Sequence, residues 1–160
     1  ALLALIPALI ARDPARVFVV GFGTGVTAGE LTALDETQEV ILAEISPAVI
    51  DGAPLFRALN QQADTNPKVH ALRRDAYRAL LRSEGRYGII VSEPSNPWVT
   101  GVEMLFSQEF LTAARAPSSR ATACTCHASP AGPTRTPDGR AHSWPSCSAR
   151  GRSRRSSQPT

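Results

Sequence analysis

The chain has 160 residues, a length that fits one domain, and a formal net charge of +3. The charge is unevenly placed: residues 1–115 hold 10 Lys and Arg against 13 Asp and Glu, whereas residues 116–160 hold seven Arg and one Asp. The basic balance therefore belongs to the C-terminal part, and we expect no nucleic-acid partner for the folded part. No apolar run reaches the length of a bilayer span and no signal peptide is evident, so we expect a cytoplasmic protein.

The pattern of apolar residues predicts alternating strands and helices. Strands are expected at residues 16–20, 39–44, 68–73 and 87–91. Helices are expected at residues 2–10, where Pro7 is predicted to break the helix, and at 25–34, 47–60, 75–82 and 104–114. Ser46 and Pro47 are the expected N-cap and first-turn residue of the third helix. The alternation is typical of an α/β fold with a doubly wound, Rossmann-like parallel sheet.

Residues 116–160 differ from the rest in composition, because they contain no Leu, Ile, Val, Phe, Met or Tyr but hold nine Ser and six Pro. Such a segment cannot bury enough apolar surface to offset the entropy of ordering, so we predict a disordered basic tail and a sheet truncated after its fourth strand. That strand would be an exposed apolar edge, and we expect the chain alone to be poorly stable and inactive.

Two hypotheses address the origin of this tail. Codons for residues 122–126, read two bases later, can encode Gly-Val-Tyr-Val, a sequence suited to a fifth strand; this favours a frameshift near residue 116. The alternative is a basic arm for RNA, DNA or acidic membrane, best supported by the arginines of residues 150–155.

The cysteines of the chain also lie in the tail. Cys124, Cys126, His127 and Cys147 are residue types that bind zinc. The Cys-x-Cys spacing is one residue shorter than the usual Cys-x2-Cys, and nothing in the sequence orders the loop between the ligands. We therefore predict no metal site.

A glycine-rich turn follows the first predicted strand. Residues 17–25 read Val-Phe-Val-Val-Gly-Phe-Gly-Thr-Gly, so four apolar residues lead into Gly21, Gly23 and Gly25. Glycines at this place let the backbone approach a nucleotide-like ligand. The dinucleotide fingerprint Gly-x-Gly-x-x-Gly would need a glycine at Val26, so the pattern favours a nucleoside without a bridging pyrophosphate. The alternative is that the glycines serve only the tight turn.

An acidic residue ends or follows each of the other three predicted strands: Glu44, Asp75 and Glu93. The carboxyl ends of parallel strands share one edge, where open α/β sheets bind ligands. A carboxylate at Glu44 can accept both hydroxyls of a ribose, and Asp75 can accept a hydrogen bond from an adenine amino group. The pattern therefore predicts a pocket for an adenosine that carries a sulfonium chain. The alternatives are a solvated edge residue for Glu44 and a plain helix N-cap for Asp75.

Four stretches resemble the spermidine synthase-like (polyamine aminopropyltransferase-like) family, within the class I S-adenosylmethionine-dependent methyltransferase fold. They are residues 17–25, 43–50, 74–76 and 92–106 followed by 109–110; the last, which begins Ser-Glu-Pro-Ser-Asn-Pro-Trp, is the most specific. The resemblance implies a partial family domain over residues 1–115. It is similar to the branch in which this domain is joined to a membrane transporter-like region, which implies fusion to or association with such a region, and a membrane tether, in a longer parent protein.

The resemblance implies a transferase that moves an aminopropyl group from decarboxylated S-adenosylmethionine to a small-molecule amine such as putrescine. It adds Ala76 to the cofactor-binding residues named above. It gives Glu93 the place of the carboxylate that deprotonates the attacking amine, and it implies that Glu93, Asn96 and Trp98 bind that amine. The alternative for Trp98 is a simple lid over the site.

This chain carries a Glu and an Asn where the family carries two Asp in the loop. That difference leaves open a different amine, or methyl transfer from S-adenosylmethionine. A non-catalytic nucleoside-binding fragment is the third hypothesis.

Overall fold

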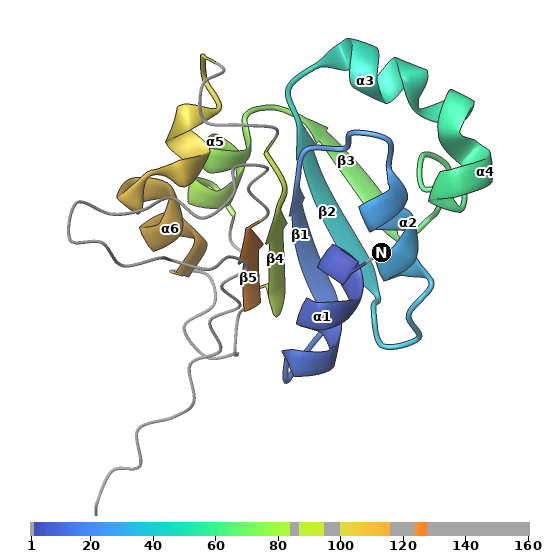
Figure 1. Cartoon of the computed structure of the whole chain (residues 1–160), viewed down its shortest axis with the longest axis horizontal. Helices are drawn as coiled ribbons and strands as arrows, with labels where there is room; N and C mark the ends of the chain where they lie inside the picture. The colour runs from blue at the N-terminus through green and yellow to red at the C-terminus, as the bar shows by residue number, and fades with distance from the viewer. Residues whose placement is uncertain (1, 84–86, 95–99, 116–123, 128–160) are drawn as a thin grey trace, which may run out of the picture.

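The structure is a computed structural model that describes residues 2–83, 87–94, 100–115 and 124–127 (Figure 1). Within this part of the chain, a parallel sheet lies between two layers of helices, as the sequence predicts. No helix in the described part has both the length and the apolar character needed to cross a lipid bilayer.

All strand pairs of the described sheet are parallel. The strands are β1 (Arg16–Val20), β2 (Glu39–Glu44), β3 (Val69–Arg73), β4 (Ile89–Ser92) and β5 (Cys124–His127). Their order is β3-β2-β1-β4-β5, so the chain first builds one side of β1 and then crosses to the other side. Between β1 and β4 the order reverses, and open α/β sheets leave a ligand crevice at such a point. The first four strands confirm the predicted ones closely.

The prediction that the sheet ends after four strands is wrong. β5 pairs with β4 along its whole length, from Ile89 opposite Cys124 to Ser92 opposite His127. Strand pairing is made by backbone N–H and C=O groups, so a short segment without aliphatic side chains can still form the ladder. The expected exposed edge at β4 is therefore covered. The rest of the predicted tail, residues 116–123 and 128–160, lies outside the described residues, and so does Cys147.

Helices cover both faces of the sheet (Figure 1). One face carries α1 (Leu2–Ile10), α2 (Val26–Thr32) and a continuous helical segment made of α3 (Pro47–Gly52), the 3-10 turn η1 (Ala53–Phe56) and α4 (Arg57–Asn60). The other face carries α5 (Ala76–Leu81), the 3-10 turn η2 (Glu103–Phe106) and α6 (Gln108–Arg115).

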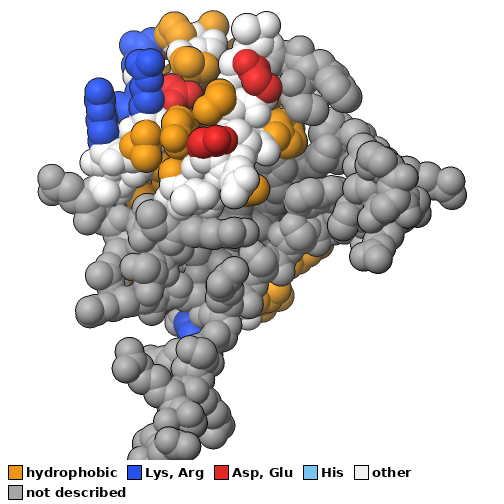
Figure 2. All heavy atoms as spheres, turned by 90° about the vertical axis from the view of Figure 1, so that its left-hand side faces the viewer, with side chains coloured by type: hydrophobic (Ala, Val, Ile, Leu, Met, Phe, Trp, Pro, Cys, Tyr) orange, Lys and Arg blue, Asp and Glu red, His pale blue; other side chains and the backbone are white. Residues whose placement is uncertain are grey.

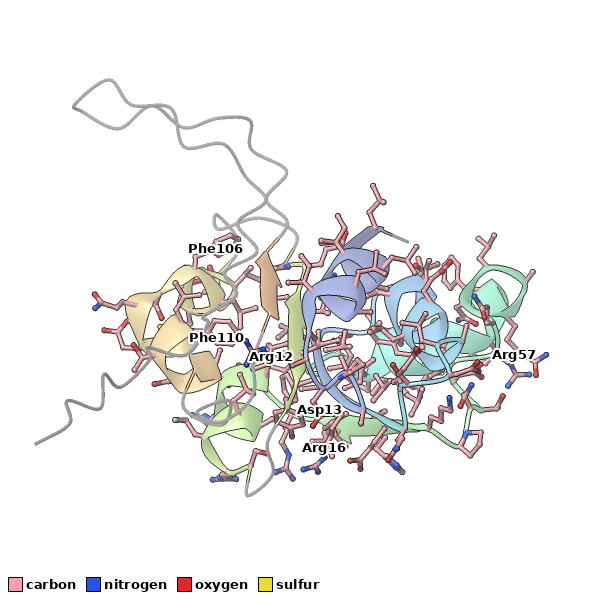
Figure 3. All side chains as sticks on the ribbon, turned by 90° about the horizontal axis from the view of Figure 1, so that it is seen from below. Arg12, Asp13, Arg16, Arg57, Phe106 and Phe110 are labelled. Atoms are coloured by element: carbon pink, nitrogen blue, oxygen red, sulfur yellow. The ribbon has the colours of Figure 1, made fainter. Side chains whose placement is uncertain are left out.

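Alternate side chains of each strand build two separate cores. In β1, Val17 and Val19 pack with Leu31 of α2 on one face, whereas Phe18 and Val20 join the core on the α5–α6 face. Phe110, which is fully buried, points from α6 toward the sheet (Figure 3). The strands are continuous in apolar residues because both of their faces are buried.

Pro7 does not break α1, contrary to the prediction. The helix runs from Leu2 to Ile10 with Pro7 inside it and buried, and the N–H of Ala11 donates to the carbonyl of Pro7 at 2.8 Å. A proline removes only its own N–H from the helix, so the bonds of the following turn can form again.

Two other predicted helices are divided. The helix expected over 47–60 changes to a 3-10 turn at η1, whose first residues include Pro54, a residue without an N–H for helical bonding. The helix expected over 104–114 is separated into η2 and α6 by Ser107, which is extended at φ −76° and ψ 158°. The Ser107 hydroxyl accepts the N–H of Phe110 at 3.1 Å, as an N-cap residue does.

A tight backbone crossing at Gly88 makes this glycine essential for the fold. A Cβ at Gly88 would overlap the carbonyl oxygen of Asp13. The Gly88 N–H donates to the backbone carbonyl of Arg16 at 2.9 Å. We expect Gly88→Ala to lower the free energy of unfolding by about 2 kcal/mol or more, because backbone must move. Chemical denaturation followed by circular dichroism measures this change.

Gly52→Ala is the matched control. Gly52 has a φ of −81°, and a Cβ there would meet nothing within 4 Å. Alanine should leave stability unchanged or raise it by about 0.5 kcal/mol. Equal free energies of unfolding for Gly88→Ala and Gly52→Ala would contradict the tight backbone crossing at Gly88.

Candidate functional site

The carboxyl ends of four strands lie in register. Val20 of β1 is opposite Ala43 of β2 and Ser92 of β4, and Ala43 is opposite Leu72 of β3. The residues that follow this row lie together at one edge of the sheet: Gly21, Glu44, Arg73 and Glu93. The shared edge that the sequence predicts is therefore present, and it includes the switch point between β1 and β4.

The glycine turn leaves β1 at this edge in a left-handed backbone conformation. Gly21, Gly23 and Gly25 have φ values of 80°, 55° and 82°, which side chains rarely adopt. The Gly21 N–H donates to the carbonyl of Ala43 at 2.8 Å, so the turn starts as an extension of the β1–β2 pairing.

The three glycines meet different surroundings. A Cβ at Gly23 would have no atom within 4 Å, so the chain is open at this position. A Cβ at Gly25 would lie 2.6 Å from the ring of Phe22 and 2.9 Å from the side-chain nitrogen of Asn60. Gly25 is thus required by packing behind the turn, which fits the alternative that a glycine serves the turn itself. Gly23 is the glycine that best fits the approach of a ligand.

Glu44 joins the loop after β1 to the loop after β2. Its side chain is almost wholly buried at 8% exposure, so the alternative of a solvated edge residue is wrong. One carboxylate oxygen accepts the N–H of Phe22 at 2.9 Å, and the other accepts the N–H of Ser46 at 2.7 Å. Ser46 stands at the predicted N-cap of α3, but its side chain makes no capping bond. Each Glu44 oxygen keeps a second lone pair for a further donor.

Asp75 is the N-cap of α5, as the alternative for this residue proposed. Its carboxylate accepts the N–H of Arg78 at 2.8 Å, and Ala76 beside it is buried. The side chain of Asp75 is half-buried, so capping leaves part of it accessible. Its predicted contact with adenine stays a prediction.

Of the three residues predicted to bind the amine, the structure describes only Glu93. This residue directly follows β4 and is exposed. Asn96 and Trp98 lie outside the described residues.

Basic side chains flank the acidic edge. Arg73 follows Leu72 at the end of β3 and approaches Asp51 of α3 at 3.9 Å. Arg74 is exposed next to it, as are Arg78 and Arg82 on the α5 side. Figure 2, which looks at the side of the molecule that carries α5 and α6, shows Lys and Arg side chains gathered along one upper border of that side. The edge therefore combines carboxylates with nearby guanidinium groups.

Asn60 is the site-forming residue that the sequence did not reveal. It is fully buried, and its side-chain nitrogen donates to the carbonyls of Thr24 at 3.0 Å and Ala53 at 3.3 Å. A Cβ at Gly29 would overlap the Asn60 backbone carbonyl. A glycine inside a helical pattern often marks a close approach, so Gly29 was the available signal.

Sequence comparisons find relatives of this chain among aminopropyltransferases. A polyamine aminopropyltransferase of Leptospira biflexa is 31% identical over 109 residues, which are 68% of this chain and 38% of that enzyme. A thermospermine synthase of Arabidopsis thaliana is 30% identical over 92 residues, 57% of this chain and 27% of that protein. No family model matches the chain.

Solved structures show the same fold. A spermidine synthase in complex with the transition-state analogue AdoDATO superposes with a TM-score of 0.72 at 20% identity, covering 79% of this chain and 43% of that one. A methyltransferase of Agrobacterium tumefaciens, described as SAM-dependent, gives 0.61 at 19% identity, covering 82% of this chain and 44% of that one. The chain is spermidine synthase-like. The predicted resemblance and the Rossmann-like fold are confirmed.

The spermidine synthase-like chain spans well under half the length of the curated relatives that it matches. Those relatives are named as transferases, so the resemblance is to a family of transferases.

The Glu44 bridge is testable through stability. Glu44→Gln replaces one acceptor oxygen by an NH2 group that must face a backbone N–H. We expect the free energy of unfolding to fall by about 1–3 kcal/mol, because a buried donor loses its partner. Urea titration measures this loss, with Glu36→Gln as the control: Glu36 is exposed, and the same change there should be neutral. Equal stability of both variants would refute the bridge.

Proposed function

We propose that this sheet edge binds the nucleoside part of decarboxylated S-adenosylmethionine, and that the chain transfers its aminopropyl group to an amine such as putrescine. The observation that carries the proposal is the buried Glu44 carboxylate, held by Phe22 and Ser46 beside the open position at Gly23. The names of the curated relatives support the reaction class.

Glu44 is suited to a ribose. Two vicinal hydroxyls need two acceptors at a fixed separation, and one carboxylate supplies them. The two backbone donors already hold this carboxylate in place. Little conformational entropy is then lost when the ribose binds.

Asp75 and Ala76 are proposed to contact the adenine. Asp75 follows the end of β3, on the β2 side of β1, and its half-buried carboxylate keeps an accessible part after capping α5. An adenine amino group is a donor that suits this acceptor.

Glu93 is proposed to prepare the amine. The carboxylate takes a proton from the bound ammonium group, and the freed nitrogen lone pair attacks the methylene carbon bonded to the sulfonium sulfur. A carbon–nitrogen bond forms, the carbon–sulfur bond breaks, and its electron pair returns to sulfur to give a neutral thioether. Because a sulfonium is already a good leaving group, the protein mainly supplies orientation and a base.

Methyl transfer from S-adenosylmethionine is the second candidate. The loop after β4 favours it, because this chain carries Glu93 and Asn96 where the aminopropyltransferase family carries two Asp, and a site for a diamine is weaker with one negative charge fewer. From the sequence resemblance we also propose that the chain is joined to a transporter-like membrane region. A cytoplasmic site of action stays an expectation from the sequence itself.

Ligand binding separates the candidates. We expect calorimetry on the full chain to show binding of decarboxylated S-adenosylmethionine and of methylthioadenosine, and no binding of NAD, because the turn lacks the third glycine of a dinucleotide site. Preference for S-adenosylmethionine would instead support methyl transfer. No binding of the three nucleosides would refute both transferase proposals.

The role of Glu93 has its own test. With putrescine as acceptor, Glu93→Gln should slow product formation by about 100-fold or more while the dissociation constant of methylthioadenosine stays the same. Glu36→Gln is the control and should keep both values. A Glu93→Gln variant with wild-type turnover would show that another group takes the proton.

A further inference from the structure

We infer that Asn60 is a positioning residue for the proposed nucleoside site, which it serves by holding the glycine turn in its binding conformation. The inference rests on the proposed function. It starts from the side-chain nitrogen of Asn60, which donates to the carbonyl of Thr24, the residue between Gly23 and Gly25.

The peptide between Thr24 and Gly25 is held at both of its ends. Its carbonyl accepts from Asn60 at 3.0 Å, and its N–H donates to the carbonyl of Phe22 at 2.8 Å. A peptide unit is planar, so two bonds on opposite sides fix its rotation. The orientation of this peptide in turn sets the path of the backbone at Gly23, where the turn is open.

The contacts leave little room for movement between α4 and α2. A Cβ at Gly25 would lie 2.9 Å from the Asn60 nitrogen, and one at Gly29 would overlap the Asn60 carbonyl. The two glycines therefore let α2 approach Asn60 closely enough for its side chain to reach the turn. The side-chain nitrogen of Asn60 also donates to the carbonyl of Ala53, which ties the turn to η1.

The chain bends sharply to keep Asn60 inside. Gln61 and Gln62, which follow it, have φ values of 54° and 58°, a left-handed conformation that is unfavourable for residues with a Cβ. Arg57 and Asp64 close this bend with three hydrogen bonds of 3.2, 3.0 and 2.7 Å, and Arg57 lies on the outer side of α4 (Figure 3). The Arg57 guanidinium holds the pKa of Asp64 below its usual value.

The burial of Asn60 itself carries a cost. Its side-chain oxygen is buried and makes no hydrogen bond to any part of the chain that the structure describes. A buried acceptor without a donor is unfavourable. The residue is thus placed for its donor nitrogen, which points to a specific task at the turn.

Lys68 supplies a matched control at the opposite end of α2. Its ammonium group donates to the carbonyls of Thr32 at 3.1 Å and Leu34 at 3.3 Å, where the helix ends. If Asn60 only stabilised α2, loss of the Lys68 contacts should affect the site in the same way.

The experiment compares Asn60→Ala with Lys68→Met in the full chain by two measurements. The first is amide hydrogen exchange without ligand at Gly25 in the turn and at Leu34, whose N–H donates to Leu31 at 3.3 Å. Asn60→Ala should speed exchange about tenfold at Gly25 and not at Leu34, and Lys68→Met should do the reverse. The second is the dissociation constant of methylthioadenosine, which should rise about tenfold in Asn60→Ala only.

Two results would overturn the inference: equal acceleration at Gly25 and Leu34 in Asn60→Ala, or equal loss of nucleoside affinity in both variants. If the wild-type chain binds no nucleoside, the proposed function fails, and exchange at Gly25 alone then decides whether Asn60 holds the turn. Asn60→Ser, which keeps a smaller donor, replaces Asn60→Ala if the latter does not fold, and its acceleration at Gly25 should be smaller but still selective.

Discussion

Strand β1 pairs in parallel with β2 on one side and with β4 on the other, and every feature of the candidate site depends on this pairing. The register aligns Val20, Ala43 and Ser92. The glycine turn, Glu44 and Glu93 each begin one residue after this aligned row, so they lie at the same edge of the sheet. In open α/β sheets the connections from the two strands at a switch point lead to opposite faces of the sheet, which leaves room for a ligand between them. A one-residue slip would place Glu44 on the other face and remove it from the turn.

Buried polar groups then join the loops at this edge into one unit. The Glu44 carboxylate links the loop after β1 to the loop after β2, and the Asn60 amide links the same turn to α4. Both groups are buried, so their hydrogen bonds do not compete with water. The turn is thereby held from two directions, and for the proposed nucleoside this would lower the ordering cost of binding.

The glycines of the turn are a set with separate tasks. Gly23 faces open space, whereas Gly25 and Gly29 make room for Phe22 and Asn60. A pattern of glycines therefore combines the needs of ligand approach and of internal packing. The motif alone cannot separate the two, because both need a missing side chain.

Local signals in the sequence determined much of the molecule. Apolar runs predicted the first four strands, and the acidic residues at their ends predicted the shared edge, since the two faces of a parallel sheet are buried and its strand ends meet. The resemblance of residues 92–106 indicated the family. Tertiary structure alone decided the rest. It placed Asn60 against a carbonyl 36 residues away, gave the Glu44 oxygens their two backbone donors, and paired β5 with β4. These contacts use backbone groups, which every residue type carries, so the residue pattern marks them at most indirectly, as Gly29 does for the close approach of Asn60.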